Sequence, residues 1–224
     1  MRRIYCVLIA AVLALSVIAA VSASAQTFTI NGDDDASWRG NTRYNSSGTY
    51  FGLFTKGGGT SDRAYVEFSL PTVPIGYELV SADLLLYNYW GTPQGKTVNY
   101  DIRIRGTEMD FDENNNTAPS GTAHENWDIA VNSFHVDSTP RLYTLDITSF
   151  FDQYQGKTVT FSIRALSGSG DGPFFVDKEG TNGQSTANRP RIKYTIAEIP
   201  PVPEPTSMLA LALGFGALVA RRRK

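Results

Sequence analysis

The sequence predicts an all-β fold, and more specifically a jelly-roll-type β-sandwich with one short helix. Short alternating or apolar runs recur along the middle of the chain, and clusters of Gly, Asn, Ser and Pro separate them. No long stretch there has the 3.6-residue period of an amphipathic helix. About nine such runs in one domain favour two packed sheets.

The expected strands are, in chain order, 28–30, 50–55, 63–70, 79–90, 97–105, 141–145, 158–166, 174–177 and 191–196. Stretches rich in turn residues lie between them, at 56–59, 71–76, 91–95, 167–173 and 180–190. Residues 112–126 are predicted to form a long polar loop, because they lack any apolar period.

One short helix is expected over residues 148–154. Asp146 or Thr148 would cap its start, and Gly156 would end it. Its large apolar side chains would face the core: Phe150, Phe151 and Tyr154.

Both ends of the chain are predicted to lie outside this domain. Residues 1–25 are organised as a secretory signal helix, with Arg2 and Arg3, an apolar stretch over 4–21, and a cleavage site at Ala23 and Ala25. Residues 26–199 would form the β-sandwich. Residues 200–224 start as a Pro-rich spacer and continue into an apolar run over 208–220, which predicts a short transmembrane helix. The basic residues after it would stay in the cytoplasm: Arg221, Arg222, Arg223 and Lys224.

Charge and cysteine content exclude several classes of protein. Residues 26–201 hold 14 Lys and Arg against 21 Asp and Glu, a net charge of −7. Nucleic-acid-binding domains are normally basic, so no nucleic-acid partner is expected. The one cysteine, Cys6, lies in the signal segment, so the mature domain has neither disulfides nor thiolate zinc sites.

The C-terminal tail carries three features in a characteristic order: Pro203-Glu204-Pro205, a short apolar run and a basic end. It resembles the PEP-CTERM sorting signal of Gram-negative bacteria. The resemblance implies export, removal of the leader by signal peptidase, and cleavage near the Pro-Glu-Pro motif by an exosortase at the inner membrane. The product would then reach the cell surface or the extracellular matrix, where proteins with this signal accompany the production of exopolysaccharide and biofilm. The alternative is an ordinary weak membrane tail.

Five stretches of the middle segment carry a second resemblance: 63–71, 80–87, 145–150, 175–180 and 189–192. In order and spacing, from about residue 35 to 196, they resemble the DNRLRE-type β-sandwich, a relative of carbohydrate-binding modules. The resemblance implies a non-catalytic domain that accompanies polysaccharides. One departure is the loop after Arg105. The family commonly has Trp-x-Glu and Thr-x-Thr-Trp there, whereas this chain has Met-Asp-Phe-Asp-Glu-Asn at 109–114.

Catalysis is not expected. The mature segment has two histidines, His124 and His135, but no nucleophile elbow, His-Glu-x-x-His motif or phosphate loop. The strand motifs of jelly-roll polysaccharide lyases are also missing. Carboxylates are plentiful, so a small polysaccharide lyase or hydrolase stays as a further alternative.

Strand alternation predicts a polysaccharide-binding face. It points Arg103 and Arg105 to the same side of one strand, and Arg63 and Arg164 outward on two others. Arginine binds carboxylates and sulfates through paired hydrogen bonds, which suits an acidic polysaccharide. Tryptophan rings can stack on sugars. The expected ligand-binding residues are Arg63, Tyr65, Arg103, Arg105, Arg164, Lys178, Trp38 and Trp90.

Each of these assignments has a structural alternative. The arginines could pair with Glu67, Asp101 and neighbouring carboxylates on a solvated sheet face. The tryptophans could serve core or rim packing.

Two acidic clusters are candidate calcium sites, because calcium takes six to eight oxygen ligands. One holds Asp33, Asp34 and Asp35 beside Asn31, and the other holds Asp110, Asp112 and Glu113. Neither has EF-hand spacing, and either could instead be a solvated acidic turn.

The sequence therefore predicts an exported, non-catalytic surface or matrix protein whose β-sandwich binds extracellular polysaccharide. The first alternative is a structural matrix protein that self-associates and binds no specific sugar.

Overall fold

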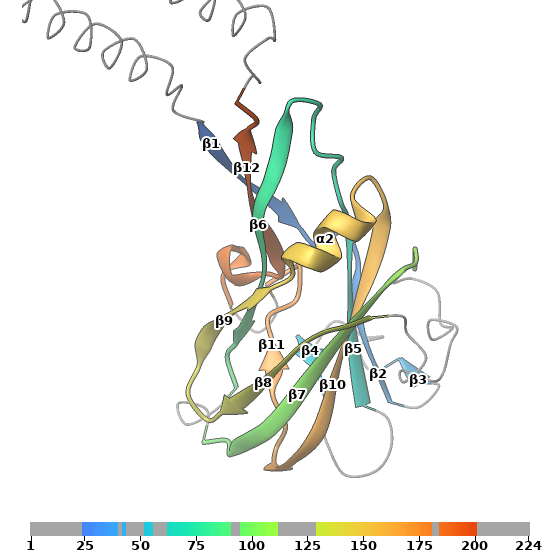
Figure 1. The fold of residues 1–224 in the computed structure, drawn as a ribbon. Coiled ribbons are helices and arrows are strands. Elements are labelled where there is room, and N and C mark those ends of the chain that lie inside the picture. The colour runs from blue at the N-terminus through green and yellow to red at the C-terminus, as the bar shows by residue number, and fades with distance from the viewer. Residues whose placement is uncertain are drawn as a thin grey trace, which may run out of the picture. The chain divides into compact units, whose positions relative to one another are not determined.

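Two antiparallel sheets form the fold in the computed structural model, which describes residues 24–39, 42–43, 52–55, 62–90, 95–111, 129–180 and 184–200 (Figure 1). Sheet A has the order β1 (Ala25–Asn31), β12 (Arg191–Glu198), β6 (Tyr77–Asn88), β11 (Phe174–Phe175) and β4 (Leu53–Phe54), and β9 (Arg141–Asp146) also pairs with β6. Sheet B has the order β3 (Thr42–Arg43), β2 (Asp35–Arg39), β5 (Asp62–Ser69), β10 (Thr158–Gly170), β7 (Val98–Glu108) and β8 (Ile129–Asp137). The other elements are helix α2 (Thr148–Tyr154) and the 3-10 turn η3 (Thr186–Asn188).

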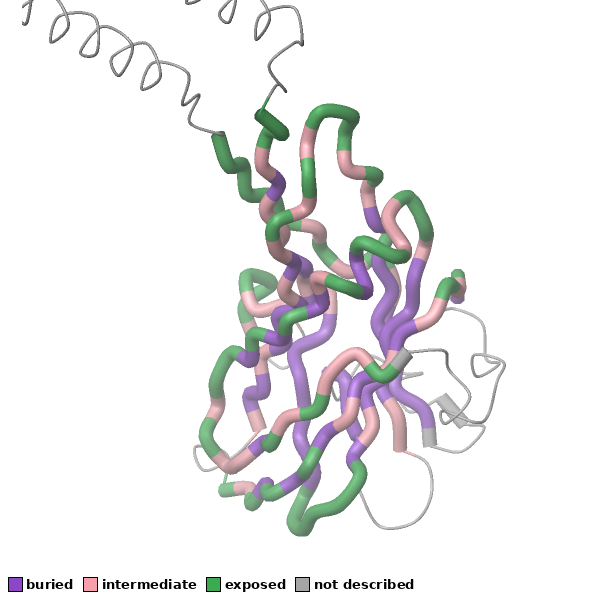
Figure 2. The backbone as a smooth tube through the Cα atoms, viewed as in Figure 1, coloured by how far each residue is buried: buried purple, intermediate pink, exposed green. Residues whose placement is uncertain are grey.

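The core lies between the sheets and consists of alternate residues of each long strand (Figure 2). In sheet B, Val66, Phe68, Ile104, Phe161 and Ile163 are fully buried. Phe68 meets Phe161 edge to face with ring centroids 5.9 Å apart. Burial of each such side chain stabilises the fold by roughly 1.5–3 kcal/mol. The predicted all-β sandwich with one short helix is confirmed.

Helix α2 has the bounds predicted for it, and it buries Phe150 and Phe151. Its N-cap is Ile147, which has no capping side chain. Asp146 instead accepts hydrogen bonds from the backbone N–H and the hydroxyl of Thr148, at 2.9 and 2.7 Å. Gly156 follows the helix with φ of 77°, a left-handed conformation that favours glycine.

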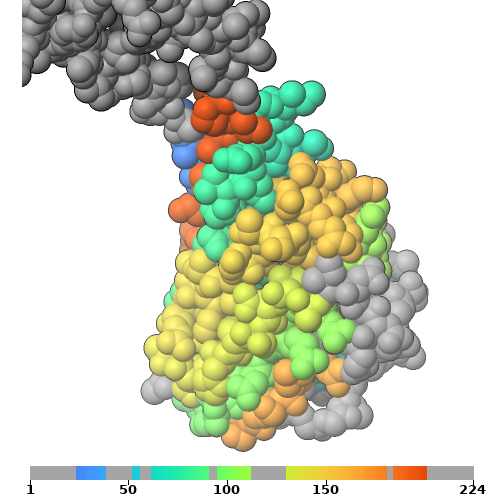
Figure 3. Space-filling view, in the orientation of Figure 1, coloured from blue at the N-terminus to red at the C-terminus, as the bar shows by residue number. Residues whose placement is uncertain are grey.

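Three strands were missed by the sequence prediction: β2, the two-residue β3, and β8. Strand β8 pairs with β7, and its side chains meet sheet A: the rings of Phe134 and Tyr143 lie 4.9 Å apart, and the Asn132 amide donates to the Asp146 carbonyl. The space-filling view shows the surface formed by α2 and β9 in yellow beside β8 in lime (Figure 3). Strand β10 runs on to Gly170, into a stretch predicted to be a turn. Each of these segments is a strand because it pairs with another strand, and the local residue pattern does not reveal such pairing.

Residues Ala25–Ala197 form one compact unit that contains these sheets and their core. Its ends are tied together, because β1 pairs with β12 along its whole length, from Ala25 opposite Ala197 to Asn31 opposite Arg191. A unit with its own core is expected to fold on its own, so residues 24–200 suit experiments in solution. The predicted signal and transmembrane helices lie outside the described residues. Within the described part of the chain, no helix is long and apolar enough to cross a bilayer.

Candidate functional site

The outer face of sheet B carries a row of arginines. Arg164 on β10 lies directly opposite Arg63 on β5 and, on its other side, directly opposite Arg103 on β7. Directly opposed residues in an antiparallel sheet point to the same face, and neighbouring strands lie about 4.8 Å apart. The three arginines therefore cross three strands in a row about 10 Å long. All three are half-buried. We call Arg63, Arg164, Arg103 and Arg105 the arginine row.

Arg105 occupies the next outward position on β7, opposite Ser162 of β10. Ser162 in turn lies opposite Tyr65 of β5. The structure therefore brings together all four arginines that strand alternation placed outward. They come from parts of the chain about a hundred residues apart, and only the strand register makes them neighbours.

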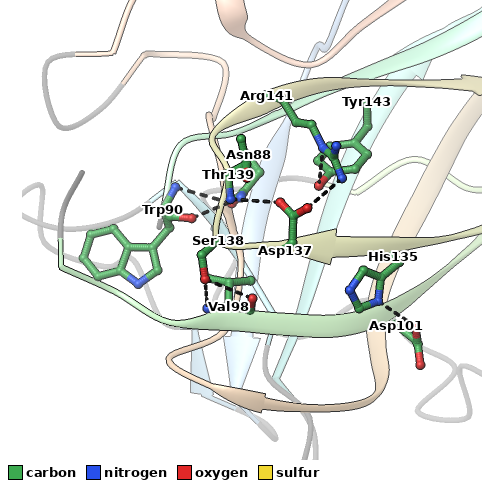
Figure 4. Close-up of polar contacts among 10 residues, drawn as sticks. All are labelled: Asn88, Trp90, Val98, Asp101, His135, Asp137, Ser138, Thr139, Arg141 and Tyr143. Carbon is green, nitrogen blue, oxygen red and sulfur yellow. Dashed lines mark hydrogen bonds and ion pairs between the residues drawn. The ribbon is translucent and has the colours of Figure 1, made fainter. Parts of the chain in front are cut away.

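A polar triplet borders the arginine row at one end. The Asp101 carboxylate lies 3.0 Å from Nδ1 of His135 and accepts a hydrogen bond of 2.7 Å from the Ser167 hydroxyl (Figure 4 shows Asp101 and His135). The bonds from His135 and Ser167 hold the pKa of Asp101 below its usual range. Asp101, predicted as an alternative partner of the arginines, is thus engaged by these two side chains. His135 escaped the sequence prediction as part of this face because β8 was not recognised.

Tyr65 and Trp38 point outward as alternation requires, yet both are buried, each 2% exposed. They pack with Ala36, Met109 and Phe111 in a small second cluster on the outer face, and the Tyr65 and Phe111 rings lie 6.3 Å apart. The expectation that these two rings lie open to a ligand is therefore wrong. The physical reason is that the segment after β7 folds back over the sheet and covers them.

Glu67 holds this covering segment in place. Its carboxylate accepts a 2.6 Å hydrogen bond from the Phe111 N–H, while the Thr160 hydroxyl donates to the Met109 carbonyl. Glu67 is only 5% exposed. Burial raises its pKa to about 7, against the lowering effect of the Phe111 N–H, and Asp110, Asp34 and Asp33 raise it further. Alternation placed Glu67 outward, but no local pattern revealed that it would be covered.

Lys178, predicted to bind a ligand, instead braces the turn between β1 and β2. Its ammonium group lies 2.9 Å from the Asp34 carboxylate and 2.8 Å from the Asp33 carbonyl oxygen. Its backbone N–H donates to Asp35, and Asp33 accepts from the Ser69 N–H. The side chain of Lys178 is 19% exposed. These contacts tie the turn to β5 and to the segment after β11.

The three carboxylates of the first acidic cluster therefore accept from three different groups: the Ser69 N–H, the Lys178 ammonium and the Lys178 N–H. Among the described residues, no three Asp, Glu, His or Cys side chains are grouped so that they could hold a metal ion. Asp110 of the second cluster is exposed, and Asp112 lies outside the described residues. The calcium site stays a prediction.

Trp90 follows β6, in the other sheet, so it does not belong to the arginine row. It is half-buried against Phe174, with ring centroids 4.7 Å apart, and the Lys96 ammonium lies 5.0 Å from its ring. Asn88 binds both its backbone carbonyl and its N–H. These contacts correspond to rim packing, which the sequence analysis gave as an alternative to sugar binding by Trp90.

The turn between β8 and β9 has a polar network of its own (Figure 4). Asp137 accepts from the Thr139 N–H and pairs with Arg141 at 3.2 Å. The Thr139 N–H is the largest cause that holds the pKa of Asp137 below its usual range. Arg141 also donates to the Tyr143 hydroxyl. This network closes the turn that connects sheet B to sheet A, and it supplies an exposed arginine away from the arginine row.

Comparison with known protein families identifies the tail of the chain. Residues 201–224 match the PEP-CTERM protein-sorting motif, which confirms the prediction made from Pro203, Glu204 and Pro205. The motif indicates a protein that is exported and processed by an exosortase. Ala25 is the first residue of β1, whereas Ala23, the Pro-Glu-Pro motif and Arg221–Arg223 lie outside the described residues. The match is confined to the tail, so the DNRLRE resemblance stays a prediction.

Two solved structures are similar to this chain at 12% identity. One is the K1 cleaved adhesin domain of Lys-gingipain from Porphyromonas gingivalis W83, with 79% of this chain and 98% of that chain covered and a TM-score of 0.28. The other is a family 35 carbohydrate-binding module from Clostridium thermocellum, with 75% and 97% covered and a TM-score of 0.25. No curated protein matches the chain.

Proposed function

We propose that this protein is an exported, non-catalytic module that binds an acidic extracellular polysaccharide on the outer face of sheet B. The observation that carries the proposal is the strand register, which sets Arg63, Arg164 and Arg103 side by side on three adjacent strands. Guanidinium groups on adjacent strands of one face can hydrogen-bond to successive anionic groups of a single polymer.

Guanidinium groups suit this task better than ammonium groups. Their planar fork gives paired hydrogen bonds to a carboxylate or a sulfate, and it stays charged at any physiological pH. A linear polymer of uronic acids presents such groups at regular intervals. The polymer would cross the strands along the arginine row, beside the polar triplet of Asp101, His135 and Ser167.

Processing would deliver the module to its ligand. Signal peptidase would cut after Ala25 and an exosortase near Pro203-Glu204-Pro205, with the C-terminal helix holding the intermediate in the inner membrane. The mature chain would then reach the surface or the extracellular matrix of a Gram-negative cell. The proposal implies no enzymatic step.

Retention on immobilised alginate tests the proposal. Residues 24–200 should be retarded at low salt and released as salt rises, because the contacts are partly screened ion pairs. Arg103→Ala combined with Arg164→Ala should weaken binding at least tenfold, since a hydrogen bond to a charged group contributes about 1.5–3 kcal/mol. Arg141→Ala, which removes an exposed arginine outside the arginine row, is the matched control and should bind like the wild type.

Equal retention of the double variant and the wild type would refute the role of the arginine row. Absence of retention on acidic and neutral polysaccharides alike would favour the structural matrix protein. Release of shortened products from a polymer would favour the lyase or hydrolase alternative.

A further inference from the structure

Strand β1 is an exposed outer strand with an unusual composition. Residues 24–32 contain no charged side chain, and six of the seven residues of Ala25–Asn31 are exposed. β1 pairs with β12 on one side, and among the described residues no strand pairs with it on the other side (Figure 1). By antiparallel geometry, alternate residues of β1 direct their N–H and C=O groups toward that open side.

The other outer strands of the described residues are protected in the ways that proteins commonly use. Strand β8 has a register irregularity opposite Ile104 and Arg105, and it carries His135 and Asp137. Strand β9 carries Arg141 and Asp146, and it contacts β8. Strands β3 and β4 are two residues long. Strand β1 has no charge, proline or register irregularity to prevent pairing with another strand.

We propose that β1 is the contact through which two copies of this chain associate, by antiparallel pairing of β1 with β1 about a two-fold axis at Phe28. In this register Phe28 opposes the second copy's Phe28, Thr27 opposes Thr29, and Gln26 opposes Ile30. Opposed residues share a face, so sheet A continues from one copy into the next.

Phe28 has the properties that this pairing requires. Phe28 is 39% exposed, and its ring stacks on Tyr194 of β12 with centroids 5.2 Å apart. Tyr194 rests in turn on the buried Phe151 at 5.0 Å, so the ring of Phe28 is held at the margin of the core. Two opposed aromatic rings across a strand pair attract each other and remove both rings from water.

Charge selects a second copy as the occupant. Residues 26–201 carry a net charge of −7, so two copies repel each other over most of their surface. An uncharged strand paired with itself places no like charges opposite each other. A single pair of seven-residue strands buries far less than the ~1,600 Å² of a standard interface, so the dimer is weak in dilute solution and forms where copies are concentrated. The proposal does not depend on polysaccharide binding.

Sedimentation equilibrium of residues 24–200, from ~10 μM to ~1 mM, tests the proposal. The wild type should shift from monomer to dimer. Phe28→Lys should remain monomeric, because pairing would place two positive charges opposite each other. Phe28→Glu should also remain monomeric, because two negative charges would oppose each other. A mixture of the two variants should form a heterodimer. Val80→Lys is the matched control, because Val80 is an exposed apolar residue, 52% exposed, on β6, which is separated from β1 by β12 in sheet A.

A cross-link keeps the test decisive if a charge at position 28 impairs folding. Residues 24–200 lack cysteine, so Phe28→Cys introduces a single thiol. Cα atoms of directly opposed residues lie about 4.5–5.5 Å apart, within the range of a disulfide. Phe28→Cys should therefore give a covalent dimer on mild oxidation, and Val80→Cys should not. A wild type that stays monomeric at ~1 mM, assembly larger than a dimer, or equal cross-linking at both positions would overturn the proposal.

Discussion

Glu67 makes the pH dependence of unfolding a test of how the outer face of sheet B is covered. Its pKa rises from an ordinary 4.5 to about 7, chiefly because the carboxyl is buried. The folded state therefore holds this proton more tightly than the unfolded chain does. The stability that the proton confers is complete below pH 4.5, declines as pH rises, and is lost above about pH 7.

The size of the effect follows from the same shift. A difference of one pH unit corresponds to about 1.4 kcal/mol, so ionised Glu67 destabilises the fold by at most about 3 kcal/mol at pH 8. Glu67→Gln removes the charge and keeps an oxygen that can accept the Phe111 N–H. At pH 4 the variant and the wild type should be about equally stable. At pH 8 the variant should be more stable, with Tm higher by up to roughly 6–12 °C at ~2–4 °C per kcal/mol.

Urea unfolding of residues 24–200, wild type and variant, at intervals from pH 4 to pH 8.5 measures the difference. Glu108→Gln is the matched control, because Glu108 on β7 is 53% exposed and pairs with Lys157 on the surface. That variant should show no such rise with pH. Parallel stability profiles of Glu67→Gln and the wild type would refute the reasoning, since Glu67 would then have an ordinary pKa in the folded state.

Three further outcomes are expected. Gly106→Ala should destabilise the domain by about 1–3 kcal/mol in urea unfolding, because the new Cβ would lie 2.4 Å from the Phe150 ring; wild-type stability would contradict that packing. Lys178→Met should cost about 1–2 kcal/mol by leaving Asp34 without its cation, whereas the exposed pair lost in Lys157→Met should cost less than about 0.5 kcal/mol. If either acidic cluster binds calcium, calcium should raise the Tm of residues 24–200 and a chelator should lower it; a Tm indifferent to both would argue against the two acidic clusters as metal sites.

Strand alternation was sufficient to predict which arginines point outward. Arg103 and Arg105, two residues apart on one strand, share a face by local geometry alone. That Arg164 lies between Arg63 and Arg103 could not be predicted, because register depends on how strands about a hundred residues apart pair. Strand β8 was missed for a related reason, since its half-exposed pattern has meaning only beside β7.

The burial of Tyr65, Trp38 and Glu67 is a property that strand alternation could not predict. Alternation assigned Tyr65 and Glu67 to the outer face, and that is where their strand places them. Their exposure was predicted wrongly, because the cover comes from Met109 and Phe111, beyond the end of another strand. A covering segment of this kind leaves no trace in the pattern of the strand that it covers.

The sequence by itself determined the all-β class, the sorting motif at the C-terminus, the acidic charge of the domain and the uncharged strand at its start. These properties depend on composition, on the period-two alternation of side chains and on short contiguous motifs. Only the tertiary structure decided that four arginines become neighbours, that Glu67 is buried away from water, and that β1 is an outer strand. Each of these depends on contacts between distant segments, and such contacts exist only once the sheets have paired and packed.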